Sequence, residues 1–195
     1  MDSVNPLALS FIKNLPALFV ALVVHEYAHG FVAHKLGDNT AKFMGRLTFN
    51  PLAHIDPFGT IILPLMLILT KSPVVFGYAK PVPVNFYNLA NPKRDMIWVG
   101  LAGPLANFTI AGLTFLILLS GAIGHSGVSG FMVTIIIINL VLGVFNLIPI
   151  PPLDGSRILM GLLPRKLAVL YARITPMHGM ILLIILLSIL RRVFD

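Results

Sequence analysis

The sequence predicts an all-α protein that crosses a membrane several times. Of its 195 residues, 57% are hydrophobic and 11% are charged, and the mean hydropathy is +0.92. A soluble domain would carry roughly 25% charged residues. Several apolar runs approach the roughly 20 residues that a helix needs to span a bilayer. We therefore expect about four transmembrane helices in a single membrane-embedded domain over residues 1–195.

Each expected span is a long apolar run. The four runs lie at about residues 7 or 15 to 34, 95–120, 131–147 and 176–190. Gly37-Asp38-Asn39 has the composition that ends the first helix. The prolines between Pro149 and Pro152 must unwind the chain after the third run. A short helix is expected next, over about residues 154–163.

The region between the first two spans carries weaker signals. Residues 40–57 mix alternating and turn-forming residues, which predicts a short β-hairpin within 42–49 and a loop. The apolar run from Phe58 to Thr70 is too short for a span, so we expect a re-entrant element there. Prolines alternate along Lys80–Val84, which predicts an extended segment.

Charge and cysteine content narrow the possible functions. The net charge is +7, but the basic residues gather in the connections at 35–57, 71–95 and 149–166, whereas 121–130 has no Lys, Arg, Asp or Glu. Such residues determine topology, and the positive-inside rule places the basic connections in the cytosol. No basic–aromatic surface pattern indicates nucleic acid binding. The absence of cysteine leaves His, Asp and Glu as candidate metal ligands.

The most informative motif lies in the first predicted helix. His25-Glu26-Tyr27-Ala28-His29 contains the only glutamate of the chain. Histidines four residues apart lie one turn apart on one helix face, where both can bind zinc, and Glu26 beside them suits a general base. Two buried histidines in a structural protein are the simpler alternative. Ionisable residues are costly within a membrane and usually functional, so the combination favours a metal site.

A catalytic zinc normally has three protein ligands, so the motif requires a third. Asp154 is the best candidate, because it follows a proline-broken membrane helix where unwound backbone can line a cavity. The alternatives are four other histidines and one aspartate: His34, His54, His125, His178 and Asp56. Of these, His54 and Asp56 lie in an irregular segment near the motif, where they could support the ligands through hydrogen bonds.

Two further motifs complete a resemblance to a known family. The run from Asn146 to Gly155 has the form N-x-x-P-x-P-x-L-D-G, and Gly103–Asn107 has the form G-P-x-x-N. Together with the histidine motif, and in this order, they resemble the site-2 protease family of intramembrane zinc metalloproteases. The chain is similar to its short, minimal branch, which has no PDZ-like or CBS-like domain.

The resemblance implies roles for particular residues. It implies that His25, His29 and Asp154 bind one zinc ion per chain and that Glu26 is the catalytic base. Asn107 and Asn146 are amides within apolar helices. They are candidates for oxyanion or substrate binding, with helix–helix hydrogen bonding as the alternative.

The implied function is hydrolysis of peptide bonds within or near the transmembrane segments of membrane proteins. We expect a multi-pass protein of a bacterial cell membrane whose active site opens toward the cytosol. A regulatory membrane partner or a homo-oligomer stays open. The alternative is a membrane metal-ion transporter that uses His and Asp ligands. Glu26 distinguishes the two, since a protease needs it for chemistry but binds zinc without it.

Overall fold

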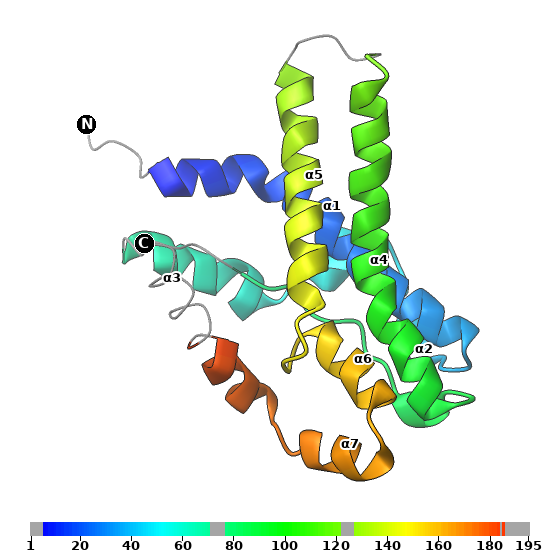
Figure 1. Ribbon diagram of the computed structural model, residues 1–195. Helices are drawn as coiled ribbons and strands as arrows, with labels where there is room; N and C mark the ends of the chain where they lie inside the picture. The colour runs from blue at the N-terminus through cyan, green and yellow to red at the C-terminus, as the bar shows by residue number, and fades with distance from the viewer. Residues whose placement is uncertain (1–5, 71–76, 122–126, 184, 186–195) are drawn as a thin grey trace.

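The computed structural model describes residues 6–70, 77–121, 127–183 and 185, and these residues form helices without any β-strand (Figure 1). The elements in chain order are α1 (Pro6–Lys35), α2 (Thr40–Phe43), η1 (Pro51–His54), η2 (Pro57–Ile62), α3 (Leu63–Leu69), η3 (Phe86–Asn88), α4 (Pro92–Leu119), α5 (Gly127–Asn146), α6 (Asp154–Leu162) and α7 (Arg165–Tyr171). Residues 176–183 are also helical. The prediction of an all-α protein is confirmed.

Three described helices are long and apolar enough to cross a membrane: Phe11–Lys35 of α1, α4 and α5. They correspond to the first three predicted spans, and the chain is a multi-pass membrane protein. The predicted count of four is not supported, because the fourth run at 176–190 lies partly outside the described residues. Pro57–Leu69 is a shorter apolar helix, as its length predicted, and its re-entry stays a prediction.

The β-hairpin predicted within residues 42–49 is wrong. Asp38 Oδ1 accepts the Thr40 amide at 3.0 Å, which favours a helical turn, and α2 follows. Gly45 then adopts a φ of +64°, and the Arg46 amide bonds back to the Ala41 carbonyl at 2.8 Å. These local bonds decide the conformation over the alternating pattern. Residues 77–85 have neither helix nor strand, and their extended conformation stays a prediction.

The core of the molecule is the contact between α1 and α4. Five of the buried residues of α1 recur at every fourth position: Ala17, Ala21, His25, His29 and Ala33. Four of the buried residues of α4 follow the same spacing, at Val99, Gly103, Asn107 and Ala111. A spacing of four places each set on one helix face. Small residues let membrane helices approach closely, so these two faces carry the histidines into the helix interface.

Helices α5 and α6 complete the surroundings of that interface. α5 packs along α4, and α6 lies below the C-terminal end of α5, against α4 (Figure 1). The chain leaves α5 at Asn146, as the prolines predicted, and begins α6 at Asp154. A Cβ atom on Gly155 would lie 2.2 Å from the Leu147 carbonyl oxygen. Only glycine therefore allows α6 to begin this close to the end of α5.

Candidate metal centre

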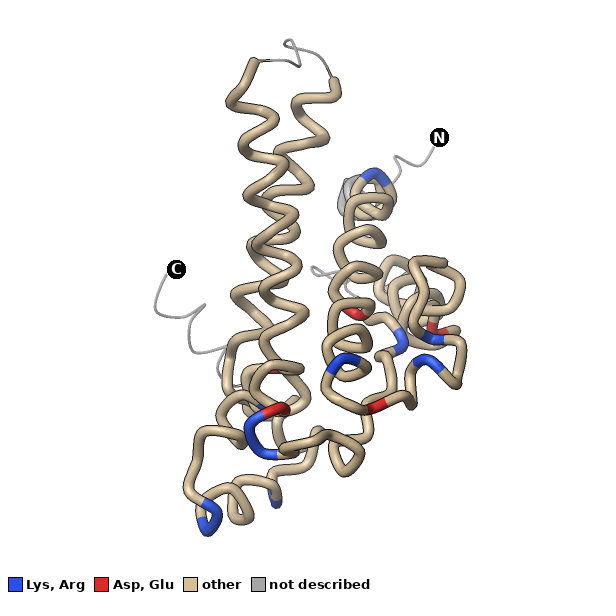
Figure 2. The backbone as a smooth tube through the Cα atoms, turned by 90° about the vertical axis from the view of Figure 1, so that its right-hand side faces the viewer, with Lys and Arg blue, Asp and Glu red and all other residues tan. Residues whose placement is uncertain are grey.

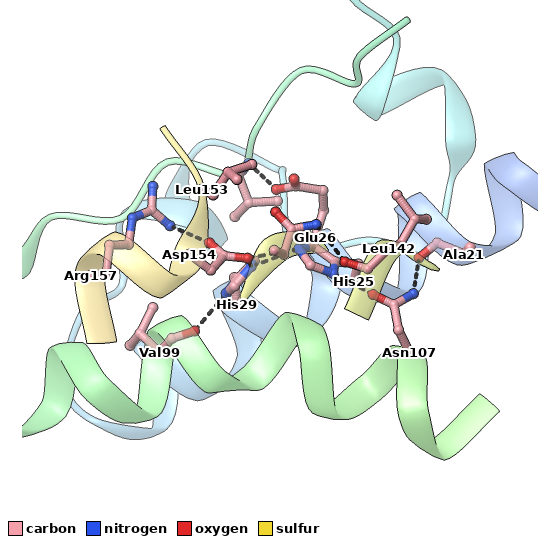
Figure 3. A network of polar contacts seen from close by, with 12 residues as sticks. Ala21, His25, Glu26, His29, Val99, Asn107, Leu142, Leu153, Asp154 and Arg157 are labelled. Carbon is pink, nitrogen blue, oxygen red and sulfur yellow. Dashed lines mark hydrogen bonds and ion pairs between the residues drawn. The ribbon is translucent and has the colours of Figure 1, made fainter. Parts of the chain in front are cut away.

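Three side-chain atoms converge between α1 and α6. His25 Nε2, His29 Nε2 and Asp154 Oδ2 each lie 3.0 Å from the other two, and all three residues are buried. The histidines share one face of α1 because they are four residues apart. Asp154 reaches them as the first residue of α6, after the chain has passed through α4 and α5 (Figure 3). The structure thus brings together the three residues predicted as zinc ligands.

The other nitrogen of each ring decides what these atoms can bind. His29 Nδ1 lies 2.6 Å from the Val99 carbonyl, which can only accept, so Nδ1 donates. His25 Nδ1 lies 2.6 Å from Asn107 Oδ1 and donates likewise. In the neutral rings both Nε2 atoms then carry lone pairs, directed at a carboxylate oxygen. Three lone pairs at this distance repel one another unless a cation lies among them.

Zinc fits this donor set. Ligands at about 2.0–2.1 Å from a tetrahedral zinc are separated from one another by about 3.3 Å, close to the distances here. Two imidazoles and one carboxylate are ligands that catalytic zinc takes, and they leave its fourth position open. Hydrogen bonds from the outer ring nitrogens orient such histidines. The residues therefore fit a catalytic zinc ion.

Asp154 is held by both of its oxygens. Oδ2 faces the histidines, and Arg157 Nη1 lies 3.3 Å from Oδ1. Arg157 thus holds one oxygen of the carboxylate, and the other is available to a metal.

Glu26 lies beside the three ligands and outside their cluster (Figure 3). Its Oε2 accepts the backbone amide of Val82 at 2.7 Å. The irregular segment that carries Val82 is held by Arg46, whose Nη2 donates to the carbonyls of Lys80 at 2.8 Å and Pro81 at 3.3 Å. These contacts leave Oε1 of Glu26 as the oxygen free of this tether. No sequence motif indicates these roles of Val82 and Arg46.

Gly103 forms the wall of the site on α4. A Cβ atom there would lie 2.5 Å from His25 Nε2 and 2.5 Å from His29 Nε2. A side chain would therefore occupy the space in which the two rings meet. The G-P-x-x-N motif contains this glycine, but its spacing alone does not show that the residue faces the histidines.

The two predicted asparagines lie in different surroundings. Asn107 accepts from His25 and donates both amide hydrogens, to the Ala21 carbonyl at 3.3 Å and to Asn139 Oδ1 at 2.8 Å. With no amide hydrogen left for an oxyanion, Asn107 orients His25. Asn146 donates to the Leu142 carbonyl of its own helix at 3.0 Å. Asn139, absent from the sequence prediction, could have been suspected as an amide in a very apolar helix.

His54 and Asp56 do not hydrogen-bond the three ligand residues. His54 Nε2 lies 2.9 Å from the Thr48 carbonyl, and its buried Nδ1 has no partner among the described residues. Asp56 Oδ1 accepts the Gly59 amide at 2.7 Å and caps η2. Among the alternative ligands, His34 bonds Asn39, His178 bonds Thr175, and His125 lies outside the described residues.

The chain matches a known protein family over most of its length. The family model described as "Peptidase family M50" matches residues 14–123 and 119–188, which together cover most of the chain. The chain belongs to peptidase family M50. This family includes the site-2 proteases, so the resemblance seen in the motifs is confirmed. Membership supports a zinc metalloprotease.

Several curated relatives share the family. This M50 member is 44% identical over 155 residues to "Putative zinc metalloprotease YwhC" of Bacillus subtilis, covering 75% of this chain and 67% of that protein. It is 31% identical over 158 residues to "Putative zinc metalloprotease Rip2" of Mycobacterium tuberculosis, covering 79% and 59%. "Zinc metalloprotease MJ0392" of Methanocaldococcus jannaschii is 30% identical over 151 residues, covering 76% and 34%. The chain thus spans about two thirds or less of these relatives. No solved structure matches it significantly.

Proposed function

We propose that this M50 member is an intramembrane protease that uses one zinc ion per chain to hydrolyse peptide bonds within or near transmembrane segments. The observation that carries the proposal is the convergence of His25, His29 and Asp154 on one point beside Glu26. Both histidines lie in α1, one of the three helices apolar enough to cross a membrane. A substrate cleaved at this point is therefore one embedded in the bilayer.

The chemistry divides between the ligands and Glu26. A zinc ion held by His25, His29 and Asp154 would acidify a water molecule and polarise the scissile carbonyl. Glu26 accepts the proton of the attacking water and later delivers it to the leaving amide nitrogen. Because the Val82 amide occupies Oε2, we assign Oε1 as the oxygen that carries this proton.

The proposed site opens toward the cytosol. Asp154 begins α6 at the end of α5 that lies away from the 121–127 connection. Most of the described Lys and Arg residues lie toward this same part of the molecule; one lies near the N-terminal end of α1, and none lies at the far end of α4 and α5 (Figure 2). The positive-inside rule then favours a cytosolic location for the face that bears the site. Its partners are a transmembrane substrate and the surrounding lipid.

A metal-ion transporter was the alternative from sequence. Membership in a peptidase family favours proteolysis. So does the position of Glu26, because its carboxylate is tethered to Val82 beside the cluster and does not join the three ligands.

The decisive experiment pairs zinc content with cleavage. Wild type, Glu26→Gln and Asp154→Ala are purified in detergent and reconstituted with single-span peptides, and products are identified by mass spectrometry. We expect one zinc per chain and cleavage within the span for wild type. Glu26→Gln should keep zinc and lose activity by about 10²–10⁴-fold, the usual contribution of a general base.

Asp154→Ala should lose both zinc and activity. Loss of zinc in Glu26→Gln would contradict the assigned roles, because it would make Glu26 a ligand. Zinc uptake into the vesicles without peptide cleavage would favour the transporter.

A further inference from the structure

A second asparagine lies behind the metal centre. Asn139 is in the middle of α5 and has no exposed surface. Its Nδ2 donates to the Ile135 carbonyl at 2.9 Å, and its Oδ1 accepts from Asn107 Nδ2 at 2.8 Å. Asn107 in turn accepts from His25. Three helices thus contribute to one line of hydrogen bonds that ends at a predicted zinc ligand.

Every bond in this line has the same polarity. A carbonyl oxygen can only accept, so Ile135 obliges Asn139 to place its NH2 group toward the backbone and its oxygen toward Asn107. That oxygen obliges Asn107 to turn its own NH2 group toward Asn139. The oxygen of Asn107 then faces His25, whose Nδ1 must donate. The proton is thereby kept off Nε2.

Removing Asn139 would release this constraint. An Asn107 side chain rotated by 180° would present its NH2 group to His25 Nδ1, which would then have to accept. The neutral ring would carry its proton on Nε2, the nitrogen that faces His29 and Asp154. A protonated Nε2 cannot bind a metal. The bond from Asn107 Nδ2 to the Ala21 carbonyl also opposes this rotation, but it is 3.3 Å long and therefore weaker than the 2.8 Å bond to Asn139.

We propose that Asn139 is a positioning residue that, through Asn107, fixes His25 in the tautomer able to bind zinc. The inference rests on the proposed role of His25 as a zinc ligand. The competing explanation is that Asn139 only joins α4 to α5, as polar residues in membrane helices commonly do. The two explanations differ in what they predict for zinc affinity and for its dependence on Asn107.

The test is zinc affinity, measured in purified full-length protein by competition with a chelating dye. Asn139→Leu, which is similar in size and cannot accept from Asn107, should weaken zinc binding at least tenfold, within the range known for groups that orient ligands. Thr134→Val is the matched control, because it removes a side-chain bond to the Gly130 carbonyl of the same helix. It should leave zinc affinity unchanged.

Two further variants separate positioning from packing. Asn139→Asp, with its carboxyl protonated in this buried place, can donate to Ile135 and accept from Asn107, so it should restore zinc affinity. Asn139→Thr can keep the bond to Ile135 but is too short to reach Asn107, so it should behave like Asn139→Leu. It also serves if Asn139→Leu does not fold, as judged by circular dichroism and gel filtration.

A double-mutant cycle decides the route. If Asn139 acts through Asn107, zinc affinity in Asn107→Leu/Asn139→Leu should equal that in Asn107→Leu alone. Additive losses, or unchanged affinity in a folded Asn139→Leu, would overturn the inference. A wild-type protein that binds no zinc would instead refute the proposed function, so the two failures are distinguishable.

Discussion

Gly103 leaves space for the metal centre because it has no side chain. His25 and His29 can bring their Nε2 atoms within 3.0 Å of each other only because α4 presents no Cβ atom at this point. The same helix face supplies the Val99 carbonyl and the Asn107 amide, which orient the two rings. One face of α4 therefore gives the histidines both their space and their hydrogen-bond partners.

We predict that Gly103→Ala displaces the imidazoles and weakens zinc binding by at least about tenfold, as loss of ligand-orienting contacts does. Gly112→Ala is the matched control in the same helix, since a Cβ atom there meets nothing within 4 Å. The control should keep zinc and gain up to about 1 kcal/mol of stability from helix propensity. Equal zinc affinity in the two variants, measured by dye competition, would contradict this account.

At the scale of elements, the irregular segment 77–85 acts as a strap across α1. Its Val82 amide holds Glu26, and Arg46 holds the Lys80 and Pro81 carbonyls. Gly30 makes room for it, because a Cβ atom there would lie 2.9 Å from Val82 Cγ1. A segment without regular structure thus positions the proposed base.

Loosening this strap should affect catalysis more than zinc. Bonds from charged donors contribute about 1.5–3 kcal/mol, so Arg46→Met should lower kcat by about tenfold or more at unchanged zinc content. Lys42→Met is the control, since Lys42 is exposed and its side chain makes no hydrogen bond or ion pair with the described residues, while its backbone carbonyl, which accepts the Gly45 amide, is unchanged by the substitution. Zinc loss that parallels the loss of kcat in Arg46→Met would show that Arg46 supports the whole site and not the base alone.

Asp38 joins the end of α1 to the strap and to η3. It accepts the Asn85 amide at 2.7 Å, the Asn88 side chain at 2.9 Å, and both the amide and the hydroxyl of Thr40. Burial opposes ionisation of Asp38, but these bonds outweigh burial and keep its pKa below the usual value. The ionised carboxylate therefore stabilises this junction.

The sign of its pH dependence follows from the lowered pKa. The stabilisation is present above the unfolded pKa of about 3.9 and is lost as the pH falls through the folded value. Asp38→Asn should therefore lower Tm at pH 6, and the difference from wild type should shrink as the pH approaches about 3. Thermal unfolding in detergent measures this. A difference that stays constant over that range would rule out ionisation as the cause.

At the scale of the whole molecule, the distribution of basic residues predicts which end lies in the cytosol. The natural chain has no cysteine, so single cysteines can report topology directly. Tyr87 is 95% exposed, and Gly127 faces open space at the other end of the helical hairpin. An impermeant maleimide should label Gly127→Cys in intact cells and Tyr87→Cys only in inverted vesicles. Labelling of both from one side would contradict the topology.

Much of this architecture follows from local sequence. The three spans are predictable because apolar length is a property of contiguous residues. The pairing of His25 with His29 is predictable because four residues in a helix always return to the same face. The predicted β-hairpin at 42–49 is wrong because an alternating pattern carries no information about the hydrogen bond from the Thr40 amide to the Asp38 carboxylate just before α2.

The sequence by itself determined the zinc chemistry, since its motif lies within one helix turn and its third ligand follows a proline break. Tertiary structure alone decided which groups orient that chemistry. The groups that do so come from separate segments. Val82 is 56 residues from Glu26, and Asn139 is 32 residues from Asn107. Gly103 lies in α4, whereas the histidines that it makes room for lie in α1. Such contacts depend on how helices pack, and helix packing is set by complementary surfaces that no single segment contains.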